Sequence, residues 1–540
     1  MPCGDRVLTM PLSYSIFKPL QPYLTLLAGC WLLLMSFAAY AQSGPELFQR
    51  HCAMCHGAQR LGLTGPALLP GNLKRLNKPG AMVAITEGLP ATQMPSFKQV
   101  LAVDEIASLV DFIYTPPARV PDWDVADIQA SHRILNPHLL TQEAAQLEPV
   151  YQADRLNLFL VVESGDHHVS VLDGDSFERI HRFKSRHALH GGPKYSSDGR
   201  YVYFASRDGW ITKFDMYRLE KVAEVRAGIN TRNAAVSADD RYVIVGNYLP
   251  HTLVILDAHD LSLIKHIPVA DYNGDVTSRV SAVYTAAPRD SFIVALKDLK
   301  EVWEISYLDD PPPVYNGYVH DYRSEEGVAE AGRFPVRRIM LDDYLDDFFF
   351  DTSYQHLIGA SRSDRNGQVI NLLVGRKIST IEMNGMPHLG SGISWEYQGR
   401  QVMASPNLRE GVVSIIDMKS WKTIKKIETL GPGFFMRSHE QSPYAWVDVF
   451  FGPNKDVVHV IDKRSLEIVK TLRPEPGKTS GHVEFTRDGK YALLSIWDKD
   501  GAVIVYDGDT LEQYKRIPMN KPVGKYNVYN KITRSSGTSH

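Results

Sequence analysis

The stretch Val503-Ile504-Val505-Tyr506-Asp507-Gly508-Asp509-Thr510-Leu511-Glu512 decides the fold, because its first half recurs along the chain. Each copy is a short apolar run that ends in aspartate, and a turn and a second strand usually follow. The clear copies are Val169–Asp173, Ile211–Asp215, Leu253–Asp257, Val413–Asp417, Val458–Asp462 and Val503–Asp507. Where neighbours are clear, the aspartates stand 42 or 45 residues apart. A period of this length, with room for four strands, is that of a β-propeller blade.

Two weaker copies, Val302–Ser306 and Val369–Leu373, fill the gap between the third and fourth clear ones. The stretch Leu308–Arg333 between them contains three consecutive prolines, and we interpret it as an insertion. Counting both weak copies gives eight blades. Seven remain possible if the weak copies merge, but the chain from 150 to 530 fits eight better. We therefore expect an all-β, eight-bladed propeller over residues 151–540.

Composition sets the limits for the rest of the chain. With 540 residues the chain is too long for one ordinary core, and 44% hydrophobic with 22% charged residues is normal for a globular protein. The net charge of -3 gives no electrostatic reason to expect nucleic-acid binding. We expect more than one domain.

The N-terminal 41 residues have the pattern of a signal peptide. Arg6 and Lys18 precede an apolar run, Leu24–Ala39, and a small-x-small end at Ala39–Ala41 suits cleavage after Ala41. Cys30 lies in a sequence that also resembles a lipoprotein processing site, which would leave a lipid anchor. Because the apolar run continues past Cys30, we favour cleavage after Ala41 and export to the periplasm.

Cys52-Ala53-Met54-Cys55-His56 is a C-x-x-C-H sequence, the attachment motif for a c-type haem. Cys52 and Cys55 would bond the macrocycle covalently, and His56 would bind its iron. The other two cysteines of the chain lie in the leader, so every cysteine after cleavage would carry haem. The alternatives are a chance match or a zinc or redox pair, and a zinc site would need more ligands nearby.

The motif belongs to a small all-α unit that we expect over residues 42–115. An amphipathic helix over 104–114 would close it, with acidic residues in its first turn. Met94 stands where class I cytochromes c, which this unit resembles, carry the sixth iron ligand. It could instead be a core methionine, or the sixth ligand could differ. Prolines then mark a linker over 116–150.

Histidines and arginines precede several propeller turns, where they could project into one end of the central channel. Any single one could be a surface or core residue, but together they suggest a buried anionic ligand with a metal. His439 fits a surface turn better. The candidates are His187, His190, Arg232, His388 and His482.

An exported class I cytochrome c fused to an eight-bladed propeller resembles the cytochrome cd1 nitrite reductases and their paralogues, the NirN-type dihydro-haem d1 dehydrogenases. The likeness runs from about residue 44 to 530. It is carried most specifically by Ala188–His190, Gly228–Arg232, Gly385–His388 and Pro522–Asn530. The resemblance implies a second, non-covalent haem d1 or dihydro-haem d1 in the propeller, with His190 as the ligand to its iron.

The same resemblance separates the two kinds of relative. His388 matches one of two histidines that donate protons in the reductases, whereas Asp346 stands where the other would fall. A carboxylate there repels nitrite, which favours the dehydrogenase, an enzyme that oxidises a propionate of dihydro-haem d1 to the acrylate. The reaction needs a base, for which His388 is our candidate with Asp346 as its partner or replacement, and haem c would accept the electrons.

Arg232 and Arg279 resemble basic positions of the family that would hold the carboxylates of the macrocycle, and Arg186, Arg337 and Arg338 are weaker candidates. The expected partners are the tetrapyrrole substrate, a periplasmic electron acceptor, and nitrite reductase or other haem d1 maturation proteins. A nitrite reductase, a non-catalytic haem d1 carrier and a plain electron-transfer propeller remain alternatives. The sequence does not predict the oligomeric state.

Overall fold

A computed structural model describes residues 43–533 except 64, 74–75, 89–93, 190–191, 316–328, 331, 362–365 and 384. The expected signal peptide, 1–41, lies outside the described residues, as does the candidate iron ligand His190. Among the helices that the structure describes, none is long and apolar enough to span a bilayer.

The N-terminal unit is all-α, as expected. It contains α2 (Gly44–His51), α3 (Ala53–His56), α4 (Lys78–Glu87) and α5 (Val103–Tyr114). The helix expected over 104–114 is α5, whose buried residues are Ile106, Leu109, Val110 and Ile113, spaced to lie on one face. This face packs on α2, where the Phe48 ring meets Phe112 edge-on at 5.4 Å. The unit thus has a core of its own.

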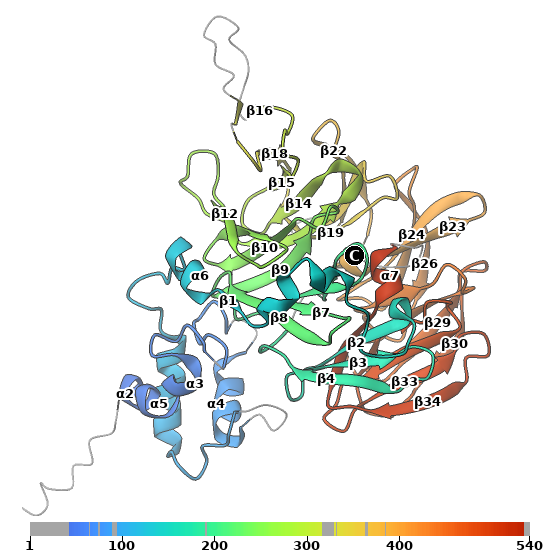
Figure 1. Ribbon diagram of the computed structural model, residues 1–540. Helices are drawn as coiled ribbons and strands as arrows, with labels where there is room; N and C mark the ends of the chain where they lie inside the picture. The colour runs from blue at the N-terminus through green and yellow to red at the C-terminus, as the bar shows by residue number, and fades with distance from the viewer. Residues whose placement is uncertain are drawn as a thin grey trace, which may run out of the picture.

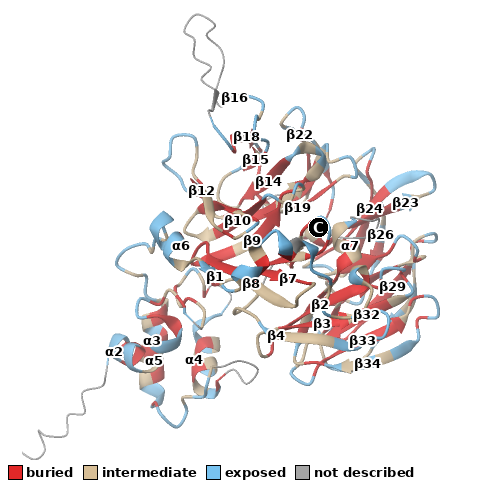
Figure 2. Ribbon diagram, viewed as in Figure 1, coloured by how far each residue is buried: buried red, intermediate tan, exposed pale blue. Residues whose placement is uncertain are grey.

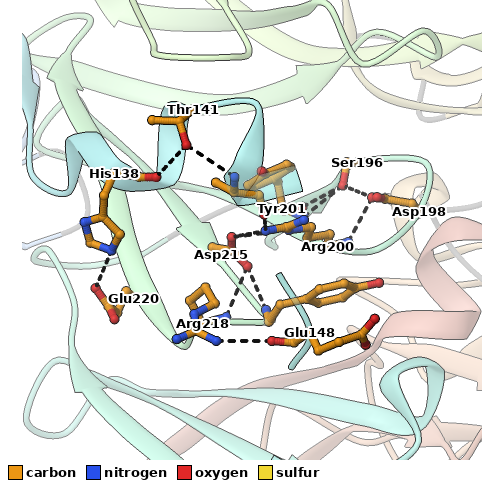
Figure 3. Close-up of polar contacts among 12 residues, drawn as sticks. His138, Thr141, Glu148, Ser196, Asp198, Arg200, Tyr201, Asp215, Arg218 and Glu220 are labelled. Carbon is orange, nitrogen blue, oxygen red and sulfur yellow. Dashed lines mark hydrogen bonds and ion pairs between the residues drawn. The ribbon is translucent and has the colours of Figure 1, made fainter. Parts of the chain in front are cut away.

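The segment interpreted as a linker is folded onto the propeller. It holds α6 (Val125–Ser131), β1 (Arg133–Ile134), and the 3-10 turns η1 (Pro137–Leu140) and η2 (Glu143–Gln146). Strand β1 pairs antiparallel with β8 (Glu220–Arg226) and adds a fifth strand to that blade. Arg200 and Asp215 of the propeller form a buried ion pair of 3.0 Å, which Figure 3 shows. Arg200 also donates a hydrogen bond of 2.7 Å to the carbonyl of Ala144 in the linker segment.

The described strands form eight blades around a central channel (Figure 1). Blade by blade, the first four are β2 (Leu158–Glu163), β3 (His168–Asp173) and β4 (Arg179–Lys184) with β35 (Pro522–Asn527); β5 (Lys194–Tyr195), β6 (Tyr201–Ala205), β7 (Trp210–Asp215) and β8; β9 (Asn230–Val236), β10 (Tyr242–Leu249), β11 (Thr252–Asp257) and β12 (Leu263–Pro268); β13 (Val280–Ala286), β14 (Ser291–Leu296), β15 (Glu301–Ser306) and β18 (Val336–Met340).

The other four blades follow the same plan. They are β19 (Leu345–Phe350), β20 (His356–Ser361), β21 (Gly367–Asn371) and β22 (Arg376–Ile381); β23 (Ile393–Tyr397), β24 (Arg400–Pro406), β25 (Val412–Asp417) and β26 (Lys422–Glu428); β27 (Met436–Ser438), β28 (Tyr444–Asp448), β29 (Val458–Asp462) and β30 (Glu467–Leu472); β31 (Ser480–Phe485), β32 (Tyr491–Ile496), β33 (Ala502–Asp507) and β34 (Gln513–Pro518). Short elements between strands are η3 (Arg155–Asn157), η4 (Ala287–Arg289), η5 (Leu389–Ser391), the pair β16 (Val314–Tyr315) and β17 (Ala329–Glu330), and α7 (Val528–Ile532).

The repeated apolar phrase is the third strand of each blade, and both weak copies are third strands as well, β15 and β21. Eight blades are therefore confirmed, and the insertion expected between the weak copies is where β16 and β17 lie. The repeated aspartate has a local reason. Asp507 accepts the backbone N–H groups of Asp509 at 3.1 Å and Thr510 at 2.8 Å, which fixes the turn to the fourth strand.

Burial falls from the channel outwards (Figure 2). Middle strands such as β11 and β33 are almost wholly buried because neighbouring blades cover both faces, whereas the outer strands β30 and β34 alternate between exposed and half-buried residues. The last strand, β35, pairs with the first, β2, and so closes the ring.

The α-helical unit contacts the propeller beside β9. Ala67 and Leu69 are buried against Ile229, which lies just before that strand. Arg226, at the end of β8, donates to the carbonyl of Leu61, and its guanidinium stacks over the Trp123 ring with 4.6 Å to the centroid. This interface, together with the folded linker, joins the two domains.

Candidate functional site

The C-x-x-C-H residues lie at α3, where Cys52 is the N-cap and Ala53–His56 form the helix. Nδ1 of His56 is 2.8 Å from the Pro66 carbonyl, and because a carbonyl can only accept, this nitrogen carries the proton. Nε2 is then left for iron. Burial lowers the pKa of His56, which favours the neutral, ligating form. The backbone at Gly65 leaves no room for a Cβ, which would lie 2.8 Å from Cε1 of the ring.

The two cysteines differ in exposure. Cys55 is exposed, whereas Cys52 is half-buried and burial raises the pKa of its thiol to about 11. Met94 packs against the same apolar cluster as Cys52. Residues 89–93, just before it, lie outside the described chain. The residues present therefore fit a haem held by Cys52, Cys55 and His56, with Met94 on the cluster that would surround it.

The propeller encloses a cavity of about 450 Å³ in its channel. Its lining comes from inner strands and from the loops between strands all around the ring. Aromatic rings form much of the wall, and three cations, two histidines and one carboxylate face the same space. The polar and aromatic lining residues are Phe204, Arg232, Asn233, Tyr284, Asp347, His388, Ser391, Phe434, Phe435, Arg437, Phe450, Phe451, His482, Trp497, Tyr526 and Lys531. Such a mixture suits a large planar ligand that carries carboxylates.

His388, a predicted catalytic residue, lines this cavity. Its Nδ1 is 2.6 Å from the carbonyl of Phe434, and its ring stacks on the Phe434 ring at 4.3 Å between centroids. Nδ1 therefore carries the proton, and Nε2 is the basic nitrogen. Burial lowers the pKa of His388, and Arg232 lowers it further, while Asp347 and the Phe434 carbonyl oppose the shift. At neutral pH the imidazole is a neutral base.

The second predicted catalytic residue, Asp346, lies elsewhere. It forms an ion pair of 2.7 Å with Lys297 and is absent from the cavity lining. Its neighbour Asp347 lines the cavity and accepts a hydrogen bond of 3.0 Å from the Tyr284 hydroxyl. Burial keeps the pKa of Tyr284 well above its usual value, so the phenol remains a donor. Gly390 packs against Asp347 so closely that a Cβ would lie 2.0 Å from Oδ2.

The two predicted carboxylate-binding arginines are also separated. Arg232 lines the cavity from β9, where its Nε donates to the Ser281 carbonyl at 2.9 Å. Arg279 forms a bidentate pair with Asp298, at 2.7 Å and 2.5 Å, and lies outside the lining. The weaker candidates Arg186, Arg337 and Arg338 pair with Glu224, Glu304 and Glu301 respectively.

Two cavity cations were not predicted. Arg437 pairs with the buried Glu484 at 2.6 Å, and Lys531 reaches the cavity from α7. Burial and the charge of Arg437 lower the pKa of Lys531 well below its ordinary value, so an anionic ligand would favour its protonation. The signal that could have indicated Arg437 was its position in the sequence directly after the apolar run Phe434-Phe435-Met436.

Of the other histidines considered from the sequence, one lines the cavity and two do not. His482 lines the cavity, with its ring 5.0 Å from that of Tyr526. His187 lies 3.2 Å from His167, and burial, with the charges of His167 and His56, lowers the pKa of His187 to about 4. The segment that contains His187 therefore lies near His56, the residue that would bind the iron of haem c. His439 is fully buried in its turn, not at the surface, and does not line the cavity.

Comparisons with known proteins agree with this arrangement. Residues 153–531 match the cytochrome D1 heme domain family, and residues 39–113 match the family of cytochrome c oxidase, cbb3-type, subunit III. The chain is 55% identical to the dihydro-heme d1 dehydrogenase of Pseudomonas aeruginosa over 94% of this chain and 98% of that protein. It is 25% identical to a nitrite reductase of Stutzerimonas stutzeri, over 91% of this chain and 92% of that protein.

A solved structure, dihydro-heme d1 dehydrogenase NirN in complex with DHE, superposes with a TM-score of 0.83. It is 55% identical in sequence, and the match covers 91% of this chain and 99% of that one. The match therefore extends over nearly the full length of that relative, through both domains of this chain. The chain belongs to the dihydro-haem d1 dehydrogenase family, within the proteins that carry a cytochrome D1 haem domain.

Proposed function

We propose that this chain is a dihydro-haem d1 dehydrogenase of the periplasm, which oxidises a propionate side chain of its tetrapyrrole substrate to an acrylate. The observation that carries the proposal is His388, a neutral imidazole in the propeller cavity whose Nδ1 is tied to the Phe434 carbonyl. Support comes from the 55% identity to a protein of that name and from the joining of the cavity to a haem c unit.

The reaction removes two protons and two electrons from the carbon–carbon bond of the side chain. Nε2 of His388 takes the first proton, because Nδ1 is already protonated and bonded. The Asp347 carboxylate, which also lines the cavity, takes the second proton. Arg232, on the inner strand of another blade, binds a substrate carboxylate, and Arg437 and Lys531 offer positive charge for a second one. The apolar rings of Phe434, Phe435 and Phe450 cover the macrocycle and exclude water.

Bound haem c would supply a one-electron acceptor, so an external partner has to reoxidise it twice in each turnover, once for each electron that leaves the substrate. We propose a periplasmic electron carrier for this step and delivery of the product to nitrite reductase or another haem d1 maturation protein. The periplasmic assignment follows from the leader over 1–41 and the covalent haem, which together favour export.

The test is turnover of the purified haem c protein with dihydro-haem d1 and an electron acceptor, followed by mass and absorbance. A product two hydrogens lighter, formed with reduction of haem c, is expected. His388→Gln should bind the substrate equally well and convert it at least a hundredfold more slowly, the usual cost of losing a general base. Unchanged tetrapyrrole would indicate a carrier, and nitric oxide formation from nitrite with a reduced donor would indicate a reductase.

A further inference from the structure

A single peptide group joins His388 to a buried carboxylate behind the cavity. The carbonyl between Phe434 and Phe435 accepts the hydrogen bond from Nδ1 of His388 at 2.6 Å. The N–H of the same peptide group, on Phe435, donates to Oδ1 of Asp448 at 3.0 Å. Hydrogen bonds in such a chain polarise one another, so a charge on the carboxylate makes the carbonyl a better acceptor.

Burial and several backbone hydrogen bonds hold Asp448 in this position. It is 1% exposed at the end of β28, and Oδ1 also accepts the N–H of Phe434 at 2.7 Å. Oδ2 accepts the N–H of His482 at 3.3 Å, and Gly481 leaves no room for a Cβ, which would lie 2.6 Å from that oxygen. One carboxylate thus holds the Phe434–Phe435 segment, which binds His388, and the segment that carries His482.

The charged groups around the two ends of this chain come from several blades. Lys525 on β35 faces Asp448, and His482 on β31 lies beside it. Asp347 on β19 and Arg232 on β9 act on His388. Burial raises the pKa of Asp448 to about 7, against the opposing effect of its backbone hydrogen bonds and of Lys525. The carboxylate is therefore ionised mainly above neutral pH.

We infer that Asp448 is a positioning residue for the dehydrogenation, acting on His388 through the peptide group between Phe434 and Phe435. It fixes the tautomer and orientation of the imidazole, and its negative charge stabilises the imidazolium that forms when Nε2 takes the substrate proton. The proton stays on His388, and Asp448 remains ionised throughout the step. The inference rests on the proposed function, since it needs His388 to be the base.

The variant that separates charge from structure is Asp448→Asn. The amide oxygen can still accept the N–H groups of Phe434 and Phe435, which go to the same oxygen in the native chain, and only the long bond of 3.3 Å from the His482 N–H is lost. We expect kcat at pH 8 to fall about tenfold, with substrate affinity unchanged, because a weaker base slows proton transfer. The rise of kcat across pH 7, expected in the native protein, should disappear.

The matched control is Asp456→Asn on the same blade. Asp456 is also buried and also accepts a backbone N–H, from Gly477 at 2.7 Å, together with a hydrogen bond of 2.6 Å from Arg473, but its described hydrogen bonds do not lead to His388. Its substitution should leave kcat and the pH profile unchanged. An equal fall of kcat in both variants would overturn the inference, because it would reveal only a general effect of blade structure.

A double variant distinguishes the role inferred for Asp448 from the proposed function, in which His388 is the base. In the His388→Gln background, Asp448→Asn should have no further effect on kcat, because its route is already removed. If Asp448→Asn alone keeps full kcat and the native pH profile while His388→Gln is inactive, the inference fails and the proposed function stands. If His388→Gln keeps full activity, both fail. Should Asp448→Asn not fold, a native kcat that does not rise across pH 7 would also overturn the inference.

Discussion

The attachment site for haem c occupies the five residues Cys52–His56 on one short helix, whereas the propeller cavity draws its lining from residues between Val162 and Lys531. In the first site, neighbours in sequence are neighbours in space. In the second, strands from around the ring each supply one or two side chains, and only closure of the ring brings them together. The haem c site can therefore be removed by changing one short segment, but the propeller cavity depends on the folding of the whole domain.

The largest effect should come from removing the local site. Replacing Cys52 and Cys55 together by serine should abolish covalent haem and turnover, because the electrons then have no acceptor in the chain. Binding of dihydro-haem d1 to the propeller should change less than twofold, measured by absorbance titration. A large loss of tetrapyrrole affinity would show that the two sites are not separable.

Adding one methyl group at Gly390 should disturb the propeller cavity. Gly390→Ala would place a Cβ 2.0 Å from Asp347, so we expect that carboxylate to be displaced and turnover to fall by about a hundredfold, within the usual range for a misplaced catalytic group. Gly71→Ala in the cytochrome unit meets no atom within 4 Å and serves as the control. Equal activities of the two variants, compared per bound haem c, would contradict the prediction.

Substrate affinity should distinguish the two predicted arginines. Arg232→Gln should raise the dissociation constant of dihydro-haem d1 about tenfold, because it removes a charged partner of a carboxylate in the cavity. Arg279→Gln should change it less than twofold, because Asp298 already occupies that guanidinium. The reverse order, measured in parallel titrations, would move the carboxylate site outside the cavity described here.

The smallest effect should be a gain of stability. The pKa of Asp448 rises from 3.8 in the unfolded chain to about 7 in the folded one, so the native state binds more protons between these values. Stability is then lost as pH rises from about 4 to 7. Asp448→Asn removes this loss and should raise the free energy of unfolding at pH 8, by roughly 2 kcal/mol, with little change at pH 4. Denaturant unfolding at the two pH values measures the difference, and a destabilised variant at pH 8 would contradict it.

Local patterns allowed much of the fold to be predicted. The spacing of six aspartates gave the blade period, because each one caps the same turn, as Asp507 does. Two weaker copies without that aspartate, Val302–Ser306 and Val369–Leu373, brought the count to eight. The C-x-x-C-H motif needs no distant residue. The folding of the linker onto β8 could not be predicted in this way. That packing depends on the pairing of β1 and on the buried ion pair between Arg200 and Asp215, which join segments far apart in sequence.

The choice between Asp346 and Asp347 shows where counting along a strand fails. Alternation would assign the two residues to opposite faces, but β19 has a register irregularity between Leu345 and Phe348. The side chain that enters the cavity is then set by the bulge and by the close approach of Gly390. His388 and Arg232 were predicted to lie at the site, and both line the cavity.

Ring closure also sets an order in time. The strand β35, which pairs with β2, carries Tyr526, and α7 directly after it brings Lys531 to the cavity. A chain that is still emerging from the ribosome therefore lacks one wall of its binding site. The tetrapyrrole can bind only after the last strand and α7 have been synthesised and the ring has closed. Binding therefore follows folding of the propeller and cannot direct it.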